Sequence, residues 1–491
     1  MTSAAKNRRD RFFLKPEQRF GTPPLTTTPP NILWYCTDQQ RFDTIAALGN
    51  QYVSTPVIDG LVKGGVAFTH AFCQSPICTP SRSSFMTGMY PSRLHNTRNG
   101  NESFPGYPPL ITRLIANAGY HCGLIGKFHL QSAGHRTEPR LDDGFDYWKF
   151  SHAPRDDWQS GHHYAEWVRD RGGDLDELRE SEDRVPPDLH QTTWASDCAI
   201  DFVTAAAGRQ QPWLLNVNIY DPHPPFIPPK VYADRFDPKQ MPGPHFRPSD
   251  LEQQKNKLNS LDFQDEIRTP EEHDAFRVQA LYYAMIAQID DQFARILSTL
   301  EATGQRDQTM IIFTSDHGES LGDHGLMFKG CRFYEGLVRV PLIFSWPGHL
   351  ESGLVNDELV ELLDLTSTLM ELAGLECPDY MQGSSLLPAM RGQPHLTRDF
   401  VRCEYFDALD PHFTGGSGTF GTMYRTNSHK LCLYHDKQIG ELYDLRSDPW
   451  EFDDLWDVES CQSIKHQLIR EAFDAHVVLT TDMGSRRIAP M

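Results

Sequence analysis

The sequence predicts an α/β fold, because short apolar runs alternate with helix-like patterns along most of the chain. The runs that we interpret as strands are 31–37, 66–72, 122–125, 213–220, 310–315 and 340–346. The clearest helical pattern covers about residues 271–300, where Leu281, Met285 and Ile289 recur at helical spacing and Gly304 follows as a stop signal. Strands that alternate with helices predict a largely parallel sheet with helices on both faces.

Size and charge narrow the class of protein. The chain has 491 residues and a formal net charge of -20, with 39% hydrophobic and 23% charged residues. The composition is ordinary for a globular enzyme. Such an acidic balance argues against binding to nucleic acid or to an anionic membrane surface. An anionic substrate would therefore need a local basic pocket.

The location that we expect is the cytoplasm. No apolar run is long enough to span a bilayer, and the first ten residues do not develop the apolar stretch of a signal peptide. The ten cysteines are scattered and form no C-x-x-C pair. Reduced, mostly buried thiols are the simplest interpretation.

We expect three segments. Residues 1–30 are polar and then rich in Pro and Thr, which favours an N-terminal arm that could contact a second copy in a homo-oligomer. Residues 31–390 form the main domain and include a helix-like stretch at 359–372. Residues 391–491 form a C-terminal α+β subdomain with a small antiparallel sheet. Its expected strands are 400–405, 430–434 and 442–444, broken by glycines between 415 and 421, and a helix near 464–477 closes it.

Polar side chains follow three of the expected strands. Asp38 comes after the first strand, Asp221 and His223 follow the strand at 213, and Asp316 and His317 follow the strand at 310. In parallel α/β sheets, ligands bind at the carboxyl ends of the strands. This pattern predicts a site at that edge.

The strongest local motif is Cys78-Thr79-Pro80-Ser81-Arg82, followed by Thr87 and Gly88. Pro80 and the serines suit the start of a helix, where the helix dipole and Arg82 favour an anion. A buried cysteine before a capped helix is the structural alternative.

With its neighbours, this motif resembles the sulfatase signature, in which the cysteine is oxidised to formylglycine. The further matching segments are 119–130 (Gly-Tyr…Gly-Lys-Phe-His), 221–223, 315–319, Lys329, 334–341 and 441–449. They occur in the expected order and the resemblance covers about residues 31–455. It implies an alkaline-phosphatase-like α/β fold with a mostly parallel central sheet.

The resemblance also implies one divalent cation. Asp38, Asp316 and His317 are the expected ligands, with residue 78 completing the set. Ca²⁺ is the first expectation, and the imidazole leaves Mn²⁺ or Zn²⁺ as alternatives. Many sulfatases have a second acid after the first strand, where this chain has Gln39, which could ligate through its carbonyl. In this respect the pattern resembles choline sulfatases and phosphonate monoester hydrolases most.

The expected chemistry assigns a role to each remaining site residue. One hydroxyl of the hydrated aldehyde at residue 78, held by the metal and Arg82, attacks sulfur. Lys127 and Lys329 neutralise developing charge. His223 is the candidate acid for the leaving oxygen, and His129 is the candidate base that releases sulfate. The structural alternatives are surface lysines, a core histidine at 129 and a rigid proline turn around 223.

The favoured activity is hydrolysis of a sulfate monoester of a sugar, aryl or small alkyl alcohol. A phosphonate monoester or phosphodiester hydrolase with the same nucleophile is the first alternative. A non-catalytic, anion-binding homologue with unmodified Cys78 is the second. The expected partners are the sulfate ester and a formylglycine-generating enzyme for maturation, and neither a nucleic acid nor a membrane.

Overall fold

The structure, a computed structural model, describes residues 29–132, 137–155, 160–180, 183, 185–257, 264–395, 397–409 and 418–481. Nearly all of the predicted N-terminal arm, residues 1–28, lies outside these residues. No helix in the described ranges combines the length and the apolar character needed to cross a membrane.

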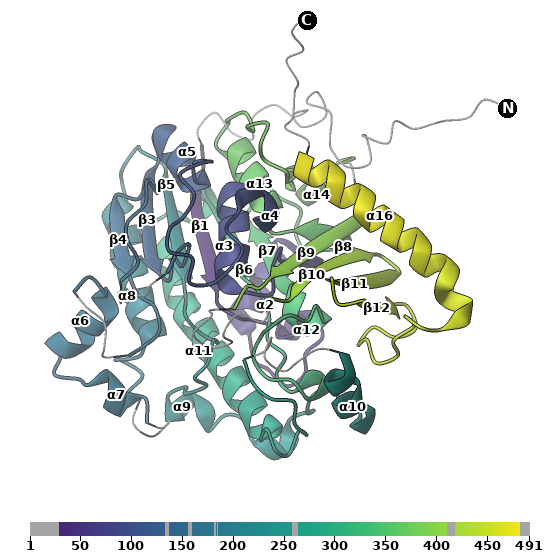
Figure 1. Cartoon of the computed structure of the whole chain (residues 1–491). Coiled ribbons are helices and arrows are strands. Elements are labelled where there is room, and N and C mark those ends of the chain that lie inside the picture. The colour runs from purple at the N-terminus through teal and green to yellow at the C-terminus, as the bar shows by residue number, and fades with distance from the viewer. Residues whose placement is uncertain are drawn as a thin grey trace, which may run out of the picture.

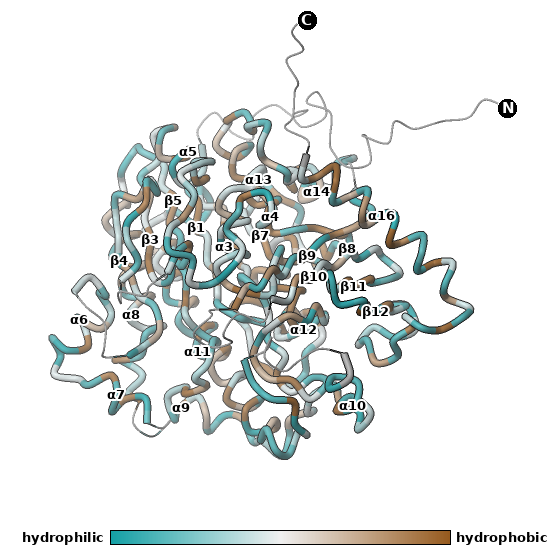
Figure 2. Tube along the Cα trace, viewed as in Figure 1, coloured by the Kyte–Doolittle hydropathy of each residue, from teal (hydrophilic) through white to brown (hydrophobic). Residues whose placement is uncertain are grey.

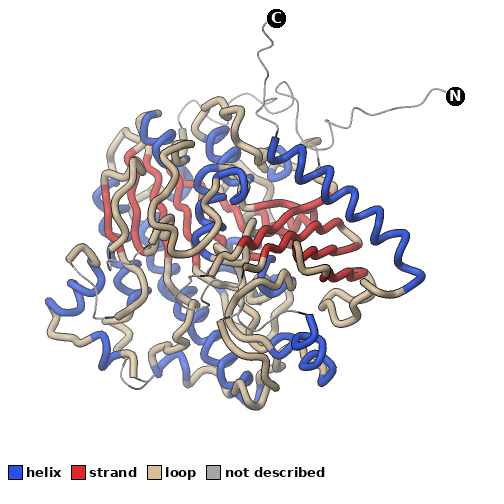
Figure 3. Tube along the Cα trace, in the orientation of Figure 1, coloured by secondary structure: helices blue, strands red, loops and turns tan. Residues whose placement is uncertain are grey.

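Two sheets organise the described chain (Figure 3). The larger sheet has the order β4-β3-β5-β1-β6-β7-β2-β8. Its strands are β1 (Asn31–Thr37), β2 (Val66–Phe72), β3 (His121–Gly126), β4 (Tyr147–Phe150), β5 (Trp213–Asn218), β6 (Thr309–Ser315), β7 (Arg339–Ser345) and β8 (Leu354–Glu361). Only β7 runs against the others among these strands. This arrangement confirms the predicted α/β class and the largely parallel sheet.

The smaller sheet has four antiparallel strands in the order β12-β11-β10-β9. They are β9 (Phe400–Phe406), β10 (Phe420–Thr426), β11 (His429–His435) and β12 (Ile439–Asp444). Helix α16 (Gln462–Thr481) lies along this sheet (Figure 1, yellow) and carries both hydrophobic and hydrophilic residues (Figure 2). The predicted boundary at residue 390 stays a prediction, since the first strand of this sheet begins at Phe400.

The described chain contains further α-helices, and several of them contribute to the cores on the two faces of the larger sheet. The longer ones are α2 (Pro56–Gly64), α3 (Cys78–Thr87), α5 (Ile111–Asn117), α6 (His163–Asp170), α8 (Gln191–Ala206), α10 (Pro248–Lys257), α11 (Ala275–Ala302) and α13 (Asp364–Leu372). The short ones are α4 (Pro91–Leu94), α7 (Leu175–Leu178), α9 (Lys230–Ala233), α12 (Glu335–Val338) and α14 (Leu387–Met390).

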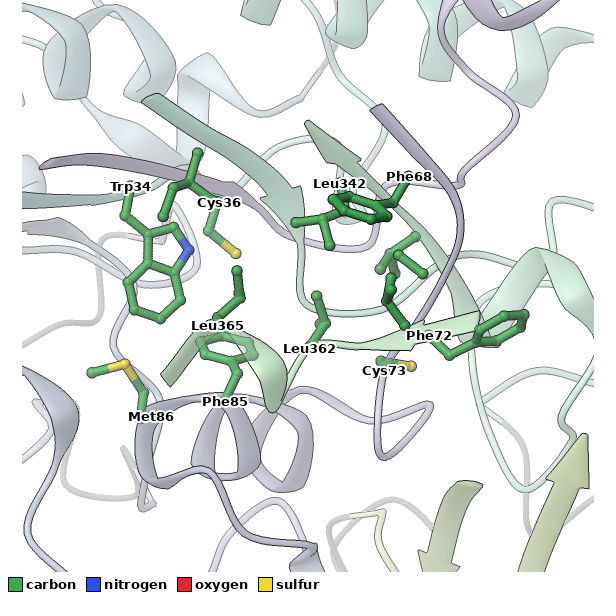
Figure 4. Packing of buried hydrophobic residues seen from close by; sticks show 14 of the residues in the cluster. Trp34, Cys36, Phe68, Phe72, Cys73, Phe85, Met86, Leu342, Leu362 and Leu365 are labelled. Carbon is green, nitrogen blue, oxygen red and sulfur yellow. The ribbon is translucent and has the colours of Figure 1, made fainter. Parts of the chain in front are cut away.

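Strand β1 shows how the sheet forms two cores. Its alternate residues point to opposite faces. Trp34 and Cys36 pack on one face with Phe85 and Met86 of α3, and the Trp34 and Phe85 ring centroids are 5.4 Å apart (Figure 4). Tyr35 packs on the other face, where α8 and α11 contribute most of the helical side chains. Because both faces are buried, β1 reads as a continuous apolar run in the sequence.

Three expectations about the elements need correction. The stretch at 359–372, predicted as helical, is divided between β8 and α13, because residues 359–361 pair with β2. Strand β4 was not predicted. Strand β10 was also missed, because Gly421 was interpreted as a break. A Cβ at position 421 would come within 3.0 Å of the Phe333 ring, so the glycine allows close packing inside the strand.

A buried charge cluster joins the smaller sheet to the larger one. Lys430 of β11 is 2.9 Å from a Glu335 carboxylate oxygen and 2.7 Å from Glu451, and all three side chains are at most 3% exposed. Burial alone would raise the pKa of Glu335, but Lys430 and Arg425 outweigh it and hold that pKa below its usual range. The joint between the sheets therefore depends on buried ion pairs.

Replacing Lys430 by Met should destabilise the protein by ~3–5 kcal/mol, because two buried carboxylates would lose their shared cation. Urea and thermal unfolding of both proteins measure the difference. The matched control is Lys239→Met, at an exposed position, which we expect to change stability by less than ~0.5 kcal/mol. Equal stability of the Lys430→Met variant and the parent protein would contradict the assigned role of this cluster.

Candidate active site

The sheet order brings the predicted site residues to one edge. Strands β3, β5, β1 and β6 are neighbours, and they are parallel. Lys127 and His129 follow the carboxyl end of β3, and His223 follows that of β5. Asp38 and Gln39 follow β1, and Asp316 and His317 follow β6. These residues, distant in sequence, therefore meet where parallel strands end.

Cys78 is the first residue of α3, and it faces this edge. Its side chain is 1% exposed. The Thr79 amide donates a hydrogen bond of 2.9 Å to Asn99 Oδ1, which caps the start of the helix. The positive end of the helix dipole favours an anionic group at position 78.

Arg82, one turn along α3, holds the two strand-end carboxylates together. Its Nε is 2.9 Å from Asp316 Oδ2, and its Nη2 is 3.0 Å from Asp38 Oδ2. Its Nη1 donates to the Lys127 carbonyl at 3.0 Å. A single buried guanidinium thus fixes the ends of β1, β3 and β6 relative to the helix that carries Cys78.

The Cys78 sulfur lies among groups from four other segments. Its Sγ is 2.9 Å from Lys329 Nζ, 3.0 Å from His317 Nε2, 3.7 Å from Lys127 Nζ and 3.8 Å from Asp38 Oδ1. Burial opposes ionisation of this thiol, but the charges of Lys127 and Lys329 outweigh burial and hold its pKa well below the usual range. Position 78 is therefore built to carry negative charge.

Lys127 is buried between Asp38 and Cys78. Its Nζ is 2.6 Å from Asp38 Oδ2, and the side chain is 1% exposed. Burial lowers the pKa of the ammonium, but Asp38 and Cys78 raise it above its ordinary value, so Lys127 stays charged. The preceding Gly126 has φ +95°, and a Cβ there would lie 1.9 Å from the Asn218 carbonyl oxygen. Only glycine permits this exit from β3.

Lys329 lies beside Cys78, His223 and Gln39. Its Nζ is 2.8 Å from Gln39 Oε1 and 3.0 Å from His223 Nε2. His223 Nδ1 lies 2.7 Å from the Pro224 carbonyl, which can only accept, so Nδ1 carries the proton and Nε2 accepts from Lys329. Burial and Lys329 both lower the pKa of His223.

His129 approaches Cys78 from the Lys127 side. A hydrogen bond between the imidazole and Cys78 contributes to the low pKa of the thiol. Burial and the charge of Lys127 lower the pKa of His129 to about 4, so the ring is neutral near pH 7. Its backbone has φ +56°, and Gln39 (φ +68°) and Phe328 (φ +64°) share this uncommon left-handed conformation next to site residues.

Four donors fit a divalent cation. Ligand atoms of Asp38, Cys78, Asp316 and His317 all lie within 4.8 Å of one another and are buried. His317 Nδ1 donates to the Gly318 carbonyl at 2.8 Å, which directs Nε2 toward the cluster. Two ionised carboxylates and an imidazole suit Ca²⁺, Mn²⁺ or Zn²⁺. The Gln39 amide oxygen is hydrogen-bonded to Lys329, and a ligand role for Gln39 stays a prediction.

Sequence reasoning missed two supporting residues. Glu319 is buried and accepts a hydrogen bond from Gln39 Nε2, and burial raises its pKa. Its signal was present in the segment 315–319, which was interpreted only for Asp316 and His317. Asn99, which caps α3, has no comparable signal, because a single asparagine in a loop carries no pattern.

Comparisons with known proteins agree with this geometry. The family model described as Sulfatase matches residues 30–375, and a model described as the C-terminal region of N-sulphoglucosamine sulphohydrolase matches residues 322–476. An arylsulfatase of Clostridium perfringens is 28% identical over 87% of this chain and 90% of its own length. A choline-sulfatase of Rhizobium meliloti is 28% identical over 88% of this chain and 83% of its own length.

A crystal structure of a phosphonate monoester hydrolase from Agrobacterium radiobacter has a TM-score of 0.78 and covers 94% of this chain and 100% of its own. At 24% identity it shows the shared fold. An uncharacterised sulfatase of Escherichia coli is 30% identical over 87% of this chain and 83% of its own length. With the model match over more than half of its length, the chain belongs to the sulfatase family.

Proposed function

We propose that this chain hydrolyses a sulfate monoester with a formylglycine made from Cys78. The observation that carries the proposal is the surroundings of the Cys78 sulfur. Two lysine ammonium groups, three imidazoles and the metal-competent carboxylates converge on this one atom, which marks where oxygens would project after oxidation. Membership of a hydrolase family supports the same conclusion.

The chain's own residues account for the steps that the reaction needs. A bound cation would be held by Asp38, Asp316 and His317, and it would act as a Lewis acid toward the ester and the nucleophile. Lys127 and Lys329, which both contact residue 78, neutralise charge on the sulfuryl oxygens. Arg82 holds both carboxylates in place through one ion pair to each.

His129 and His223 take the proton-transfer roles beside residue 78. His129 is neutral near pH 7 and is the base that deprotonates the remaining hydroxyl, so that sulfate leaves as the aldehyde re-forms. The alcohol oxygen receives its proton from the His223–Lys329 pair. The ester bond broken is the one between sulfur and the alcohol oxygen.

Two alternatives remain from the sequence. A phosphonate monoester or phosphodiester hydrolase would use the same residues, and the structural likeness to a phosphonate monoester hydrolase supports keeping it. An anion-binding protein with unmodified Cys78 would keep the site and lack turnover. Maturation by a formylglycine-generating enzyme, the cytoplasmic location and a homo-oligomeric state belong to this proposal and each needs its own test.

Replacement of Cys78 by Ala should reduce kcat by about 10³-fold or more, because the nucleophile is lost. Peptide mass spectrometry of the active parent protein should find the peptide with residue 78 lighter by about 18 Da than its cysteine form. Cys432→Ala, at a buried cysteine in β11, is the matched control and should retain kcat. Full turnover by protein whose Cys78 is unmodified would refute the proposed nucleophile.

Substrate preference separates sulfate from phosphonate chemistry. We expect kcat/KM for 4-nitrophenyl sulfate to exceed that for 4-nitrophenyl phenylphosphonate and for bis(4-nitrophenyl) phosphate. All three esters share the leaving group, so initial rates at 400 nm compare the transferred group alone. A higher kcat/KM for the phosphonate or the diester would favour the first alternative.

Arg82→Lys should weaken binding of the divalent cation by about 10- to 100-fold, because a lysine cannot bridge Asp38 and Asp316 as the guanidinium fork does. Isothermal titration calorimetry with Ca²⁺ and Mn²⁺ on metal-stripped protein measures the affinity. Arg209→Lys, at an exposed position, is the matched control. Unchanged affinity in the Arg82 variant would show that the carboxylates do not depend on this bridge.

A further inference from the structure

Glu138 makes an unusual set of contacts beside the site. Its Oε2 accepts a hydrogen bond of 2.6 Å from the His129 amide, and its Oε1 accepts from the amides of Leu130 at 2.6 Å and Gln131 at 3.1 Å. The side chain is 5% exposed. Three consecutive backbone N–H groups thus converge on one buried carboxylate, as in an anion-binding nest.

The turn that Glu138 binds contains a strained residue. His129 has φ +56°, a left-handed conformation that non-glycine residues rarely adopt. Such conformations persist where surrounding contacts enforce them. The three amide hydrogen bonds of Glu138 are contacts of this kind, because they require the amides of residues 129–131 to point in one direction.

The imidazole of His129 depends on its backbone for its position. Its Nδ1 is buried and finds no hydrogen-bond partner among the residues that the structure describes. The ring packs edge-to-face on His152, with centroids 4.7 Å apart, and reaches Cys78. A shift of the turn at 129–131 would therefore move the ring directly.

Burial of Glu138 beside the site disfavours the ionised form of its carboxyl group. Burial raises the pKa of Glu138 to about 7, although the amides of Leu130 and His129 lower it. Costly buried acids of this kind gather at functional sites.

We propose that Glu138 is a positioning residue for the hydrolysis: its carboxylate fixes the turn at 129–131 and so holds the His129 imidazole at residue 78. The inference rests on the proposed role of His129 as the base that releases sulfate. A misplacement of about 1 Å at a reacting group costs on the order of 100-fold in rate, so the contribution of Glu138 is measurable.

The test is a double-mutant cycle on the matured, metal-loaded full chain with 4-nitrophenyl sulfate. Glu138→Gln should lower kcat by about 10- to 100-fold and leave KM within about threefold, with unchanged formylglycine content and metal content. In a His129→Ala background, Glu138→Gln should cause no further loss of kcat. Glu138→Asp keeps an anionic acceptor and should retain more kcat than Glu138→Gln.

A matched control separates positioning from general stability. Asp290 of α11 is 1% exposed and also accepts two backbone amides, those of Val57 and Ile58, outside the site. Asp290→Asn should lower the melting temperature and leave kcat of the folded enzyme unchanged.

Three results would overturn the proposal. Glu138→Gln could lower only the melting temperature, as the control does, or its effect on kcat could add fully to that of His129→Ala. Glu138→Gln could also retain more kcat than Glu138→Asp. Full kcat in His129→Ala would show that His129 is not the base, and the role of Glu138 would then fall with it. The proposed nucleophile would still stand in that case if Cys78→Ala lost all turnover.

Discussion

Two carboxylates stand side by side in the interior of this protein, and the contact of Arg82 with both of them is the constraint on which the site depends. Without a counter-charge, burial would raise the pKa of Asp38 and favour its neutral form. Arg82 binds both, and Lys127 adds a second cation to Asp38. Burial favours the neutral acid, but these charges hold the pKa of Asp38 below its usual range. Asp38 therefore stays ionised, and it does so because α3 and the end of β3 supply the cations.

The same cations would allow an acidic protein to accept the anionic ester of the proposed reaction. The chain carries a formal net charge of -20, so its field at a distance opposes a sulfate group. Charges farther apart than a Debye length, about 8 Å at physiological ionic strength, are largely screened. Arg82, Lys127 and Lys329 are each 1% exposed, and their charges act at contact distance where water is excluded. In the proposed reaction, recognition of the sulfuryl group would therefore depend on a few buried side chains and not on the charge of the surface.

Much of this arrangement could be predicted because residues that follow parallel strands in the sequence lie at the same edge of the sheet. The bounds of β1 and β2 match the apolar runs, and Asp38, His223, Asp316 and His317 were found as polar residues that follow such runs. Strands β4 and β10 lacked that signal: β4 is four residues long and only partly buried, and β10 contains Gly421. Residues 359–372 have apolar spacing that suits a helix, and the pairing with β2 that makes 359–361 a strand is a long-range contact. Asn99 and Glu138 were missed for a related reason, since each acts through backbone amides that a sequence pattern does not reveal.

Gln39 shows how one neutral side chain alters the charge at such a site. Its amide oxygen accepts from Lys329 at 2.8 Å, and its amide nitrogen donates to Glu319. A carboxylate at position 39 would form an ion pair with Lys329 and neutralise part of the charge of its ammonium group. It would also add negative charge beside Asp38 and Asp316 and so strengthen the attraction for a divalent cation. With glutamine, the metal site is less negative and Lys329 keeps more of its charge for a ligand near Cys78. Under the proposed function, glutamine at position 39 would therefore favour attraction of the anionic ester over affinity for the cation.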